Sequence, residues 1–130
     1  MLAVKCIGVR TEDLKSLATK QYLPGSGDVV WIDLDPPTGH EQAGRRPCIV
    51  LSDHIYSKRT GMAIICPITS KPKGLPFEVQ LKGTKVNGAI LPIHVRSVDF
   101  TSRFVKYIET APPTTLYKTK SYVRIIMEMV

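Results

Sequence analysis

The chain has 130 residues, enough for one domain with a single hydrophobic core and too few for two. Apolar residues make up 43% and charged residues 22%, a balance that is typical of a globular protein and excludes a disordered chain. The 18 Lys and Arg residues outnumber the 11 Asp and Glu residues, so the net charge of +7 is expected to attract a polyanion. RNA, DNA, an acidic membrane surface and an acidic protein tail all remain candidates.

The sequence favours a cytoplasmic protein without disulfides. No apolar run approaches the roughly 20 residues that a membrane helix needs, and residues 1–8 lack the apolar region and cleavage site of a signal peptide. The three cysteines, Cys6, Cys48 and Cys66, form no Cys-x-x-Cys pair, and their odd number argues against a disulfide framework. Cys48 and Cys66 lie in apolar runs and are predicted to be core residues.

Residues 1–26 differ from the rest of the chain and are predicted to be an extension of the domain formed by residues 27–130. Thr11-Glu12-Asp13 resembles a helix start, and Pro24-Gly25-Ser26-Gly27 indicates a flexible break. The extension is therefore expected to be either a short helix or a loose tail, and we find no chemistry in it.

From Asp28 onward, runs of β-branched and aromatic residues predict short strands separated by turns. Ser52 and Asp53 are predicted to cap one helical turn that runs through Tyr56, and Trp31 is predicted to pack in the core. The strands are expected at residues 29–34, 47–51, 62–68, 77–81, 89–93, 96–100 and 104–108.

After Pro112 the apolar period changes to that of a helix. Residues 113–128 are predicted to form an amphipathic helix that packs on the sheet. Its apolar face is expected to contain Leu116, Lys120, Val123, Ile126, Met127 and Val130. Many short strands and one closing helix predict a small α+β domain, an antiparallel barrel that is partly closed.

The chain lacks the motifs of metal and nucleotide enzymes. It has no P-loop, no His-Glu-x-x-His motif and no Gly-x-Ser-x-Gly elbow. His40, His54 and His94 are scattered, so no metal site and no cofactor are expected.

Three polar segments follow or precede predicted strands. The loop of residues 37–47 brings together His40, Glu41, Gln42, Arg45 and Arg46. A guanidinium suits a phosphate because it offers a planar fork of donors and stays charged. A solvated loop with an Arg–Glu ion pair is the alternative at this point.

The second segment, residues 69–74, offers hydroxyls and lysines from Thr69, Ser70, Lys71 and Lys73 at a strand exit. It could hold phosphate oxygens or be a polar turn. The third, residues 93–97, adds His94 and Arg96. The three segments form one groove only if the sheet brings them together.

Taken in order, these segments resemble the MazF/PemK toxin family. The two most specific runs are Glu-Gln-x-Gly-x-Arg-Pro at residues 41–47 and Lys-Gly-x-Pro-Phe-Glu-Val at residues 73–79. The resemblance begins at Gly27-Asp28-Val29-Val30-Trp31 and continues through Asn87-Gly88-Ala89 and Val95-Arg96-Ser97. It covers nearly everything after residue 26.

The resemblance implies an SH3-like antiparallel barrel that forms a homodimer and binds an antitoxin of the MazE/PemI type with an acidic tail. It implies a metal-independent endoribonuclease that cuts single-stranded mRNA at a preferred sequence. In the family's reaction a ribose 2′-OH attacks the adjacent phosphorus, which gives a 2′,3′-cyclic phosphate and a 5′-hydroxyl end.

The family pattern assigns the catalytic pair to Arg46 and Thr69, and its acidic loop position to Glu41, which either accepts the 2′-OH proton or orients Arg46. Many relatives carry Asp-Gln where this chain has Ile93-His94. His94 therefore either replaces that aspartate as base or contacts an RNA base. The expected RNA-binding residues are His40, Gln42, Arg45, Ser70, Lys71, Lys73, His94 and Arg96.

Two rival functions fit the same fold. One is a toxin resembling CcdB, which poisons gyrase and cuts nothing, and the other is an RNA-binding barrel without catalysis. The chain ends in Met127-Glu128-Met129-Val130 and lacks the Trp-Gly-Ile tail of the CcdB-like toxins, which favours the nuclease.

Overall fold

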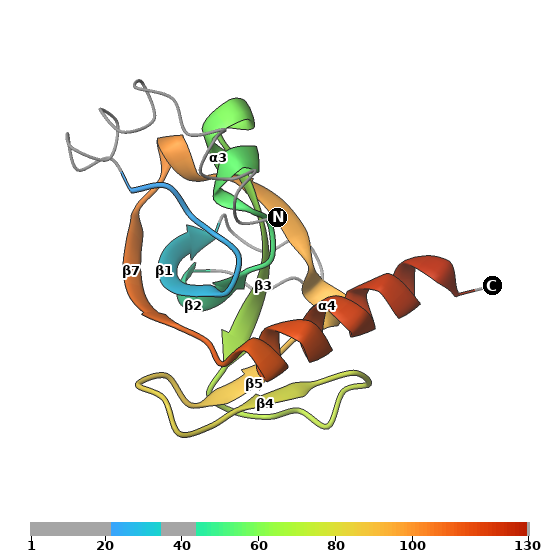
Figure 1. Cartoon of the computed structure of the whole chain (residues 1–130). Coiled ribbons are helices and arrows are strands. Elements are labelled where there is room, and N and C mark those ends of the chain that lie inside the picture. The colour runs from blue at the N-terminus through green and yellow to red at the C-terminus, as the bar shows by residue number, and fades with distance from the viewer. Residues whose placement is uncertain (1–21, 35–43, 130) are drawn as a thin grey trace.

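In the computed structural model, which describes residues 22–34 and 44–129, the chain forms a curled antiparallel sheet and a C-terminal helix (Figure 1). The sheet order is β4-β5-β3-β2-β1-β7, and β6 pairs with β3 beside this path. The strands are β1 (Asp28–Leu34), β2 (Gly44–Val50), β3 (Met62–Thr69), β4 (Val79–Leu81), β5 (Gly88–Ile90), β6 (Arg96–Asp99) and β7 (Val105–Thr110). The helical elements are α3 (His54–Thr60), α4 (Pro113–Glu128) and the 3-10 turns η1 (Pro92–His94) and η2 (Phe100–Ser102).

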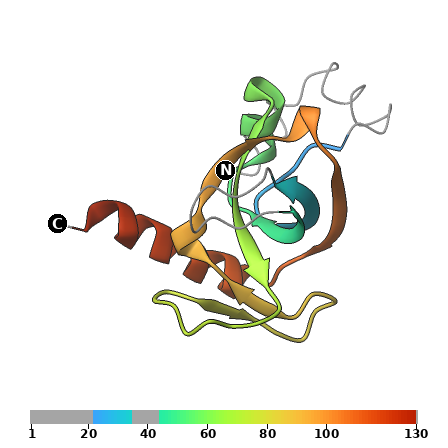
Figure 2. The same ribbon diagram turned by 180° about the vertical axis from the view of Figure 1, so that it is seen from behind.

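The predicted α+β barrel is confirmed. Long β3 pairs with β2, β5 and β6, so the sheet bends around it and closes about halfway into a barrel. Seen from behind, α4 crosses beside β4 and β5 at the open end (Figure 2).

Alternation along the strands gives each face of the sheet its own core. Val29, Ile49 and Cys66 belong to the cluster that Leu116 and Val123 of α4 cover. Val30, Cys48 and Ile65 belong to the second cluster, against which Tyr22 and Leu23 pack. Cys48 and Cys66 are both buried, as predicted. They belong to different clusters because side chains alternate along β2 and β3 and these two point to opposite faces of the sheet.

Two strand predictions were wrong for reasons of backbone geometry. The strand predicted at 77–81 begins only at Val79, because Phe77 has a left-handed backbone with φ of 66°. The strand predicted at 89–93 covers Gly88–Ile90 instead, because Pro92 has no N–H for a ladder and starts the turn η1. His94 therefore lies in a 3-10 turn and not at a strand end.

The other strand boundaries moved by a few residues. β2 begins at Gly44 and not at Pro47, which places Arg45 and Arg46 in the sheet and not in the preceding loop. β7 runs from Val105 to Thr110, two residues further than predicted.

The predicted helix 113–128 is confirmed, but its predicted apolar face is only partly buried. Thr119 and Val123 are buried, and Leu116 and Tyr122 pack beside them. Met127 is 72% exposed because the second half of α4 extends beyond the sheet (Figure 1).

Helix α3 is longer than the predicted single turn. The Asp53 side chain accepts from the Ile55 N–H at 2.9 Å, and Gly61 ends the helix in a left-handed conformation with φ of 70°. The helix therefore continues for two turns before it reaches Gly61.

Residues 22–26 pack on the barrel, whereas the helix predicted near Thr11 lies outside the described residues. Ser26 donates to the Leu51 carbonyl at 3.0 Å, and the Gly25 N–H donates to Asp28 at 3.0 Å. Residues 24–27 thus form a held turn and not a flexible break. The domain boundary at residue 26 stays a prediction.

Within residues 22–34 and 44–129, no helix combines the length and the apolar character required to span a membrane.

Candidate nucleic-acid interface

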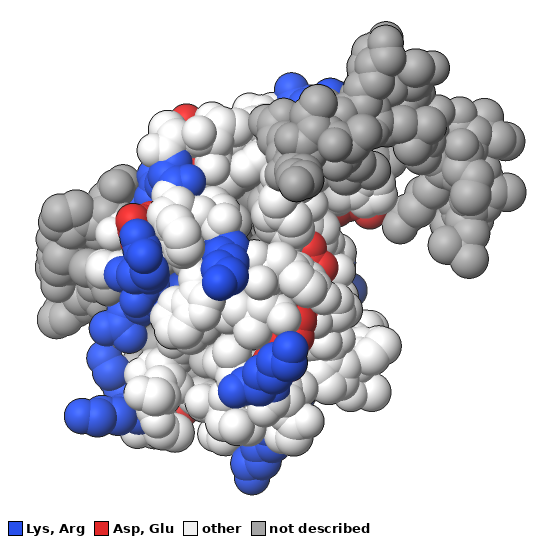
Figure 3. Space-filling view, turned by 90° about the vertical axis from the view of Figure 1, so that its left-hand side faces the viewer, with Lys and Arg blue, Asp and Glu red and all other residues white. Residues whose placement is uncertain are grey.

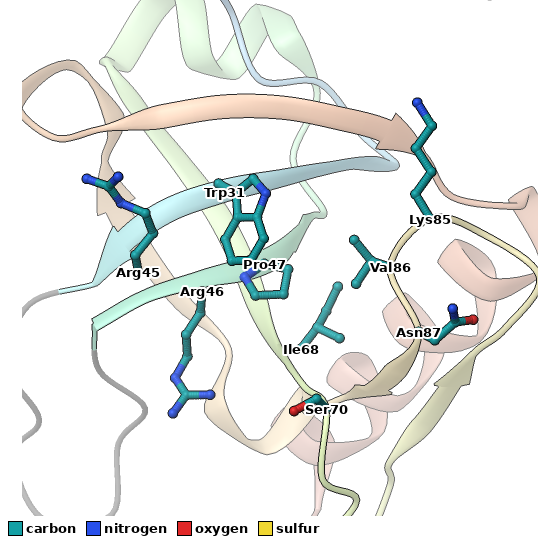
Figure 4. Close-up of a pocket in the computed structure, with 9 residues that line it drawn as sticks. All are labelled: Trp31, Arg45, Arg46, Pro47, Ile68, Ser70, Lys85, Val86 and Asn87. Carbon is teal, nitrogen blue, oxygen red and sulfur yellow. The ribbon is translucent and has the colours of Figure 1, made fainter.

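A pocket of about 480 Å³ opens between β1, β2, β3 and the loop that joins β4 to β5 (Figure 4). We call it the Trp31 pocket. It is lined by Trp31, Arg45, Arg46, Pro47, Ile68, Ser70, Lys85, Val86 and Asn87. Its floor is apolar and its rim carries three cations, a combination that suits a nucleotide, whose base stacks and whose phosphate is anionic.

The prediction that Trp31 packs in the core was wrong. Its side chain is 38% exposed and borders the pocket. Trp31 lies opposite Pro47 in the β1–β2 ladder, and the two residues share a face. Trp31 is the central residue of β1, and its indole is open to solvent on this face.

Arg45 is fixed by two partners. Its guanidinium donates to both carboxylate oxygens of Asp33, at 2.7 and 3.1 Å, and lies 3.8 Å from the centre of the Phe104 ring. The hydrogen bond from Arg45 lowers the pKa of Asp33, and the same bond raises the pKa of Arg45. Arg45 therefore presents a partly neutralised cation at the rim.

Arg46 lies on the opposite face of β2 from Pro47, and in Figure 4 its side chain points away from Trp31. Burial raises the pKa of the Cys48 thiol, while Arg96 and Arg46 both oppose that rise. Arg96 pairs with Ile65 of β3, which belongs to the same buried cluster as Cys48, so Arg96 and Arg46 project from the same face of the sheet.

Thr69 projects from the same face of the sheet as Arg46. Cys48 pairs with Pro67 across the β2–β3 ladder, and residues directly opposite each other in an antiparallel pair point to one face. Arg46 and Thr69 each lie two residues from this pair along their strands, so their side chains project from the same face. Arg46, Thr69 and Arg96 thus share one face, although they come from three separate strands, and we call them the Arg46 cluster.

The Thr69 side chain is nearly buried, at 5% exposure, and bonds locally. Its hydroxyl accepts from the Lys71 N–H at 3.2 Å and donates to the Lys71 carbonyl at 3.3 Å. To hold a phosphate oxygen, the hydroxyl has to exchange the long bond to the Lys71 carbonyl for one to the phosphate.

The remaining predicted residues are spread around these two features. Ser70 lines the Trp31 pocket, while Lys71 and Lys73 are exposed on the loop after β3 and do not line it. Glu78 accepts from the Lys73 and Leu75 N–H groups at 3.1 and 2.9 Å and holds that loop.

His94 lies in η1, which contacts β3 and α4. His40, Glu41 and Gln42 lie outside the described residues.

The loop that joins β4 to β5 was missed as part of the site. It is not among the three polar segments that the sequence singled out, yet Lys85, Val86 and Asn87 line the pocket. The lysines and the turn pair Asn87-Gly88 were the available signal, but only the fold shows which strand ends this turn faces.

Cations line one edge of the face that Figure 3 shows. Figure 3 shows Lys and Arg side chains in a column along one edge of the view, where Asp and Glu side chains are few. Among the described residues, no three His, Cys, Asp or Glu side chains are grouped so that they could hold a metal ion.

A curled antiparallel barrel with an aromatic pocket beside a cluster of arginines defines a class of small nucleic-acid-binding barrels. Within that class, residues 26–127 match the model of the PemK-like, MazF-like toxins of type II toxin-antitoxin systems, and the chain belongs to this family. The resemblance seen in the sequence motifs is thereby confirmed.

Individual relatives agree with this assignment. The chain is 38% identical over 107 residues to the endoribonuclease toxin MazF of Escherichia coli strain K12. This alignment covers 82% of this chain and 96% of the relative. The crystal structure of MazF (Form-I) from Deinococcus radiodurans is 40% identical, with a TM-score of 0.79 over 84% of this chain and 100% of that chain. A MazE-MazF crystal structure (Form-II) from the same organism is 37% identical, with a TM-score of 0.72 over 85% of this chain and 100% of that one.

Proposed function

We propose that the protein is the toxin of a toxin–antitoxin pair and acts in the cytoplasm as a sequence-selective endoribonuclease on single-stranded mRNA, without a metal ion. Family membership supports the proposal, as does the name of the E. coli relative, an endoribonuclease toxin. The observation that carries it is that Arg46, Thr69 and Arg96 project from one face of the sheet, although they come from three separate strands.

The proposed reaction is a transesterification within the RNA. The 2′-oxygen of one ribose forms a bond to the adjacent phosphorus, and the bond from that phosphorus to the 5′-oxygen of the next nucleotide breaks. A base removes the 2′-OH proton and an acid delivers a proton to the leaving 5′-oxygen. The products are a 2′,3′-cyclic phosphate and a 5′-hydroxyl end.

Arg46 is the proposed stabiliser of the crowded phosphorane, because charge builds up on its oxygens and a guanidinium donates to two of them at once. An arginine remains protonated near neutral pH, so an electrostatic role suits it better than that of a base. Thr69 is proposed to donate to a phosphate oxygen from the neighbouring strand.

Two residues remain candidates for the base. Glu41 either accepts the 2′-OH proton or orients Arg46, and His94 occupies the position of an aspartate found in many relatives. The pH dependence of cutting separates them, because an ordinary histidine titrates near pH 6.5 and an ordinary glutamate near pH 4.3. A rate that rises through about pH 6.5 and loses this step in His94→Ala assigns the base to His94.

The RNA is proposed to cross the first residues of β2, with the scissile phosphate at the Arg46 cluster and a neighbouring base in the Trp31 pocket. This path follows from the two faces of β2, which present Arg46 on one side and Pro47 on the other. His40, Gln42, Arg45, Ser70, Lys71, Lys73 and Arg96 are proposed to steer and hold the backbone or the bases along this path.

The proposal is tested with purified protein and a long mixed RNA in EDTA. We expect discrete cuts with cyclic-phosphate and 5′-hydroxyl ends, and mapping these ends gives the preferred sequence. Arg46→Ala is expected to lower the cutting rate about 100-fold or more while RNA still binds. Arg124→Ala, which removes an exposed cation of α4, is the matched control and is expected to cut normally.

Other outcomes of this experiment identify the rival functions. RNA that binds but stays intact under all conditions indicates a binding barrel without catalysis. Intact RNA together with arrested gyrase indicates a CcdB-like poison. Normal cutting by Arg46→Ala removes Arg46 from the mechanism.

We also propose that the protein forms a homodimer and binds a cognate antitoxin whose acidic or amphipathic tail lies along the same cationic groove. The likeness to a MazE-MazF complex supports the antitoxin, and the exposed side chains of Met127, in the last turn of α4, and Met129, just after the helix, support a partner surface. A solution mass of 14.4 kDa at micromolar concentration would contradict the dimer. RNA cutting that is unaffected by the bound antitoxin would contradict the shared groove.

A further inference from the structure

Glu109 of β7 holds the loop that forms one wall of the Trp31 pocket. Its two carboxylate oxygens accept from the Lys85 and Val86 N–H groups, each at 2.9 Å. One side chain thus bonds to two consecutive backbone donors of a loop more than 20 positions away in sequence.

The loop is also braced internally at the same place. The Thr84 hydroxyl donates to the Val86 carbonyl at 2.6 Å, and the Asn87 amide donates to the Thr84 carbonyl at 3.3 Å. These bonds fix the shape of residues 84–87, whereas the bonds from Glu109 fix the position of that segment relative to the barrel.

The held segment faces the aromatic side of the pocket. Lys85, Val86 and Asn87 all line it, and Figure 4 shows Val86 beside Ile68, on the opposite side of the pocket from Arg45. The strands on either side of the loop, β4 and β5, have three residues each and anchor the loop weakly. A shift of the loop would move this wall of the pocket.

We propose that Glu109 is a positioning residue for RNA: by fixing the Lys85–Val86 backbone, it keeps the loop wall of the Trp31 pocket in place to receive a nucleotide next to the cut. This inference rests on the proposed function. A preordered wall raises affinity because binding then does not have to order the loop. Glu109 thereby also fixes the position from which Lys85 contacts the RNA backbone.

The test uses the full chain and a short single-stranded RNA that spans the mapped cut site, with a 2′-deoxy sugar at the cut so that it binds without reacting. Trp31 is the only tryptophan, so its fluorescence reports occupancy of this pocket. Glu109→Ala is expected to weaken binding about tenfold, because two hydrogen bonds to a charged acceptor are lost. Glu109→Gln retains one acceptor oxygen and is expected to fall between Glu109→Ala and the parent protein.

Asp99→Ala is the matched control. Asp99 also accepts from a loop, through the Thr101 N–H at 2.9 Å and the Thr101 hydroxyl at 2.5 Å, but no residue of that loop lines the pocket. Both substitutions raise the net charge by one, so their general effect on RNA attraction is the same. Asp99→Ala is therefore expected to bind RNA as the parent protein does, even where it lowers the melting temperature.

A double-mutant cycle separates positioning from a merely structural role. If Glu109 acts through the loop, Lys85→Ala costs less affinity in the Glu109→Ala background than alone. Full additivity, or affinity of Glu109→Ala and Glu109→Gln equal to that of the parent protein, overturns the inference and leaves the proposed function intact. A parent protein that neither binds nor cuts RNA overturns both.

Discussion

At Gly88 the backbone of β5 approaches β3 so closely that no side chain fits between the strands. A Cβ atom on residue 88 would lie 2.3 Å from the Thr69 carbonyl oxygen and 3.0 Å from its carbonyl carbon. The smallest residue is therefore required at the position that backs the proposed catalytic threonine. The turn pair Asn87-Gly88 has a role in packing as well as in turning.

Gly88→Ala is expected to push β5 away from Thr69. The overpacking should lower the free energy of unfolding by about 1–3 kcal/mol and reduce RNA cutting in proportion to the fraction of molecules that unfolds. Urea unfolding and the cutting rate measure the two effects. Gly25→Ala is the control, because its new Cβ meets atoms only at 3.6 Å or more, and it should unfold as the parent protein does. Equal urea midpoints for both variants would contradict the argument.

The rim arginines show why residue type alone does not assign a role. Arg45 and Arg46 are neighbours in sequence, yet alternation sends them to opposite faces of β2. Arg45 is engaged by Asp33 and Phe104, whereas Arg46 shares the opposite face of the sheet with Cys48 and Arg96. The prediction that both are near RNA stays open, but the two have different surroundings.

Among the elements, α3 connects the residues that precede β1 to the barrel. Ser57 of α3 is 1% exposed, and its hydroxyl donates to the Pro24 carbonyl at 2.7 Å. This bond spans 33 positions of the sequence and fastens the chain before it enters the sheet. Residues 22–26 are therefore part of the packed unit that the structure describes.

Ser57→Ala is expected to destabilise the fold by about 1–3 kcal/mol, because the Pro24 carbonyl is left buried without its donor. The Trp31 pocket lies elsewhere, so RNA affinity of the folded protein should not change. Thermal unfolding and Trp31 fluorescence titration check the two halves of the prediction. Ser97→Ala, at an exposed position of β6, serves as the control and should change neither.

The elements that sequence patterns predicted best are those whose signals are local. The helix 113–128 was predicted with its observed ends, because Pro113 fits the first turn and the apolar period is that of a helix. The strands near Phe77 and Pro92 were less accurate, because a left-handed residue and a missing N–H interrupt runs that look continuous by hydrophobicity. Periodicity reports burial and does not report backbone dihedrals.

On the scale of the whole molecule, the net charge is +7, and on the face shown in Figure 3 Lys and Arg side chains form a column along one edge. Clustered cations on one side strengthen the field there and draw a polyanion to that side. The Arg46 cluster and the rim of the Trp31 pocket add local charge where the RNA is proposed to bind. RNA binding and the cleavage reaction are therefore expected to respond to salt in different ways.

RNA affinity is expected to fall steeply as salt rises, because each phosphate contact releases counterions. For a single strand the slope of log K against log salt changes by about 0.7 for each contact. Lys85→Ala should therefore reduce the magnitude of this slope by about 0.7. The slope is obtained from RNA titrations followed by Trp31 fluorescence at salt concentrations of roughly 50 to 200 mM. Arg124→Ala on α4 should leave the slope unchanged. An unchanged slope in Lys85→Ala would exclude a phosphate contact at Lys85.

The sequence by itself determined the fold class, the closing helix and the family, because apolar period, turn residues and motif order are all written locally in the chain. The arginine and threonine of the proposed chemistry come from the resemblance to the family pattern. Only the tertiary structure decided that Trp31 faces a pocket, that Lys85 and Val86 form its wall and that Glu109 holds them. These relations join strands that are far apart in sequence. They depend on register and on the curl of the sheet, which no local pattern encodes.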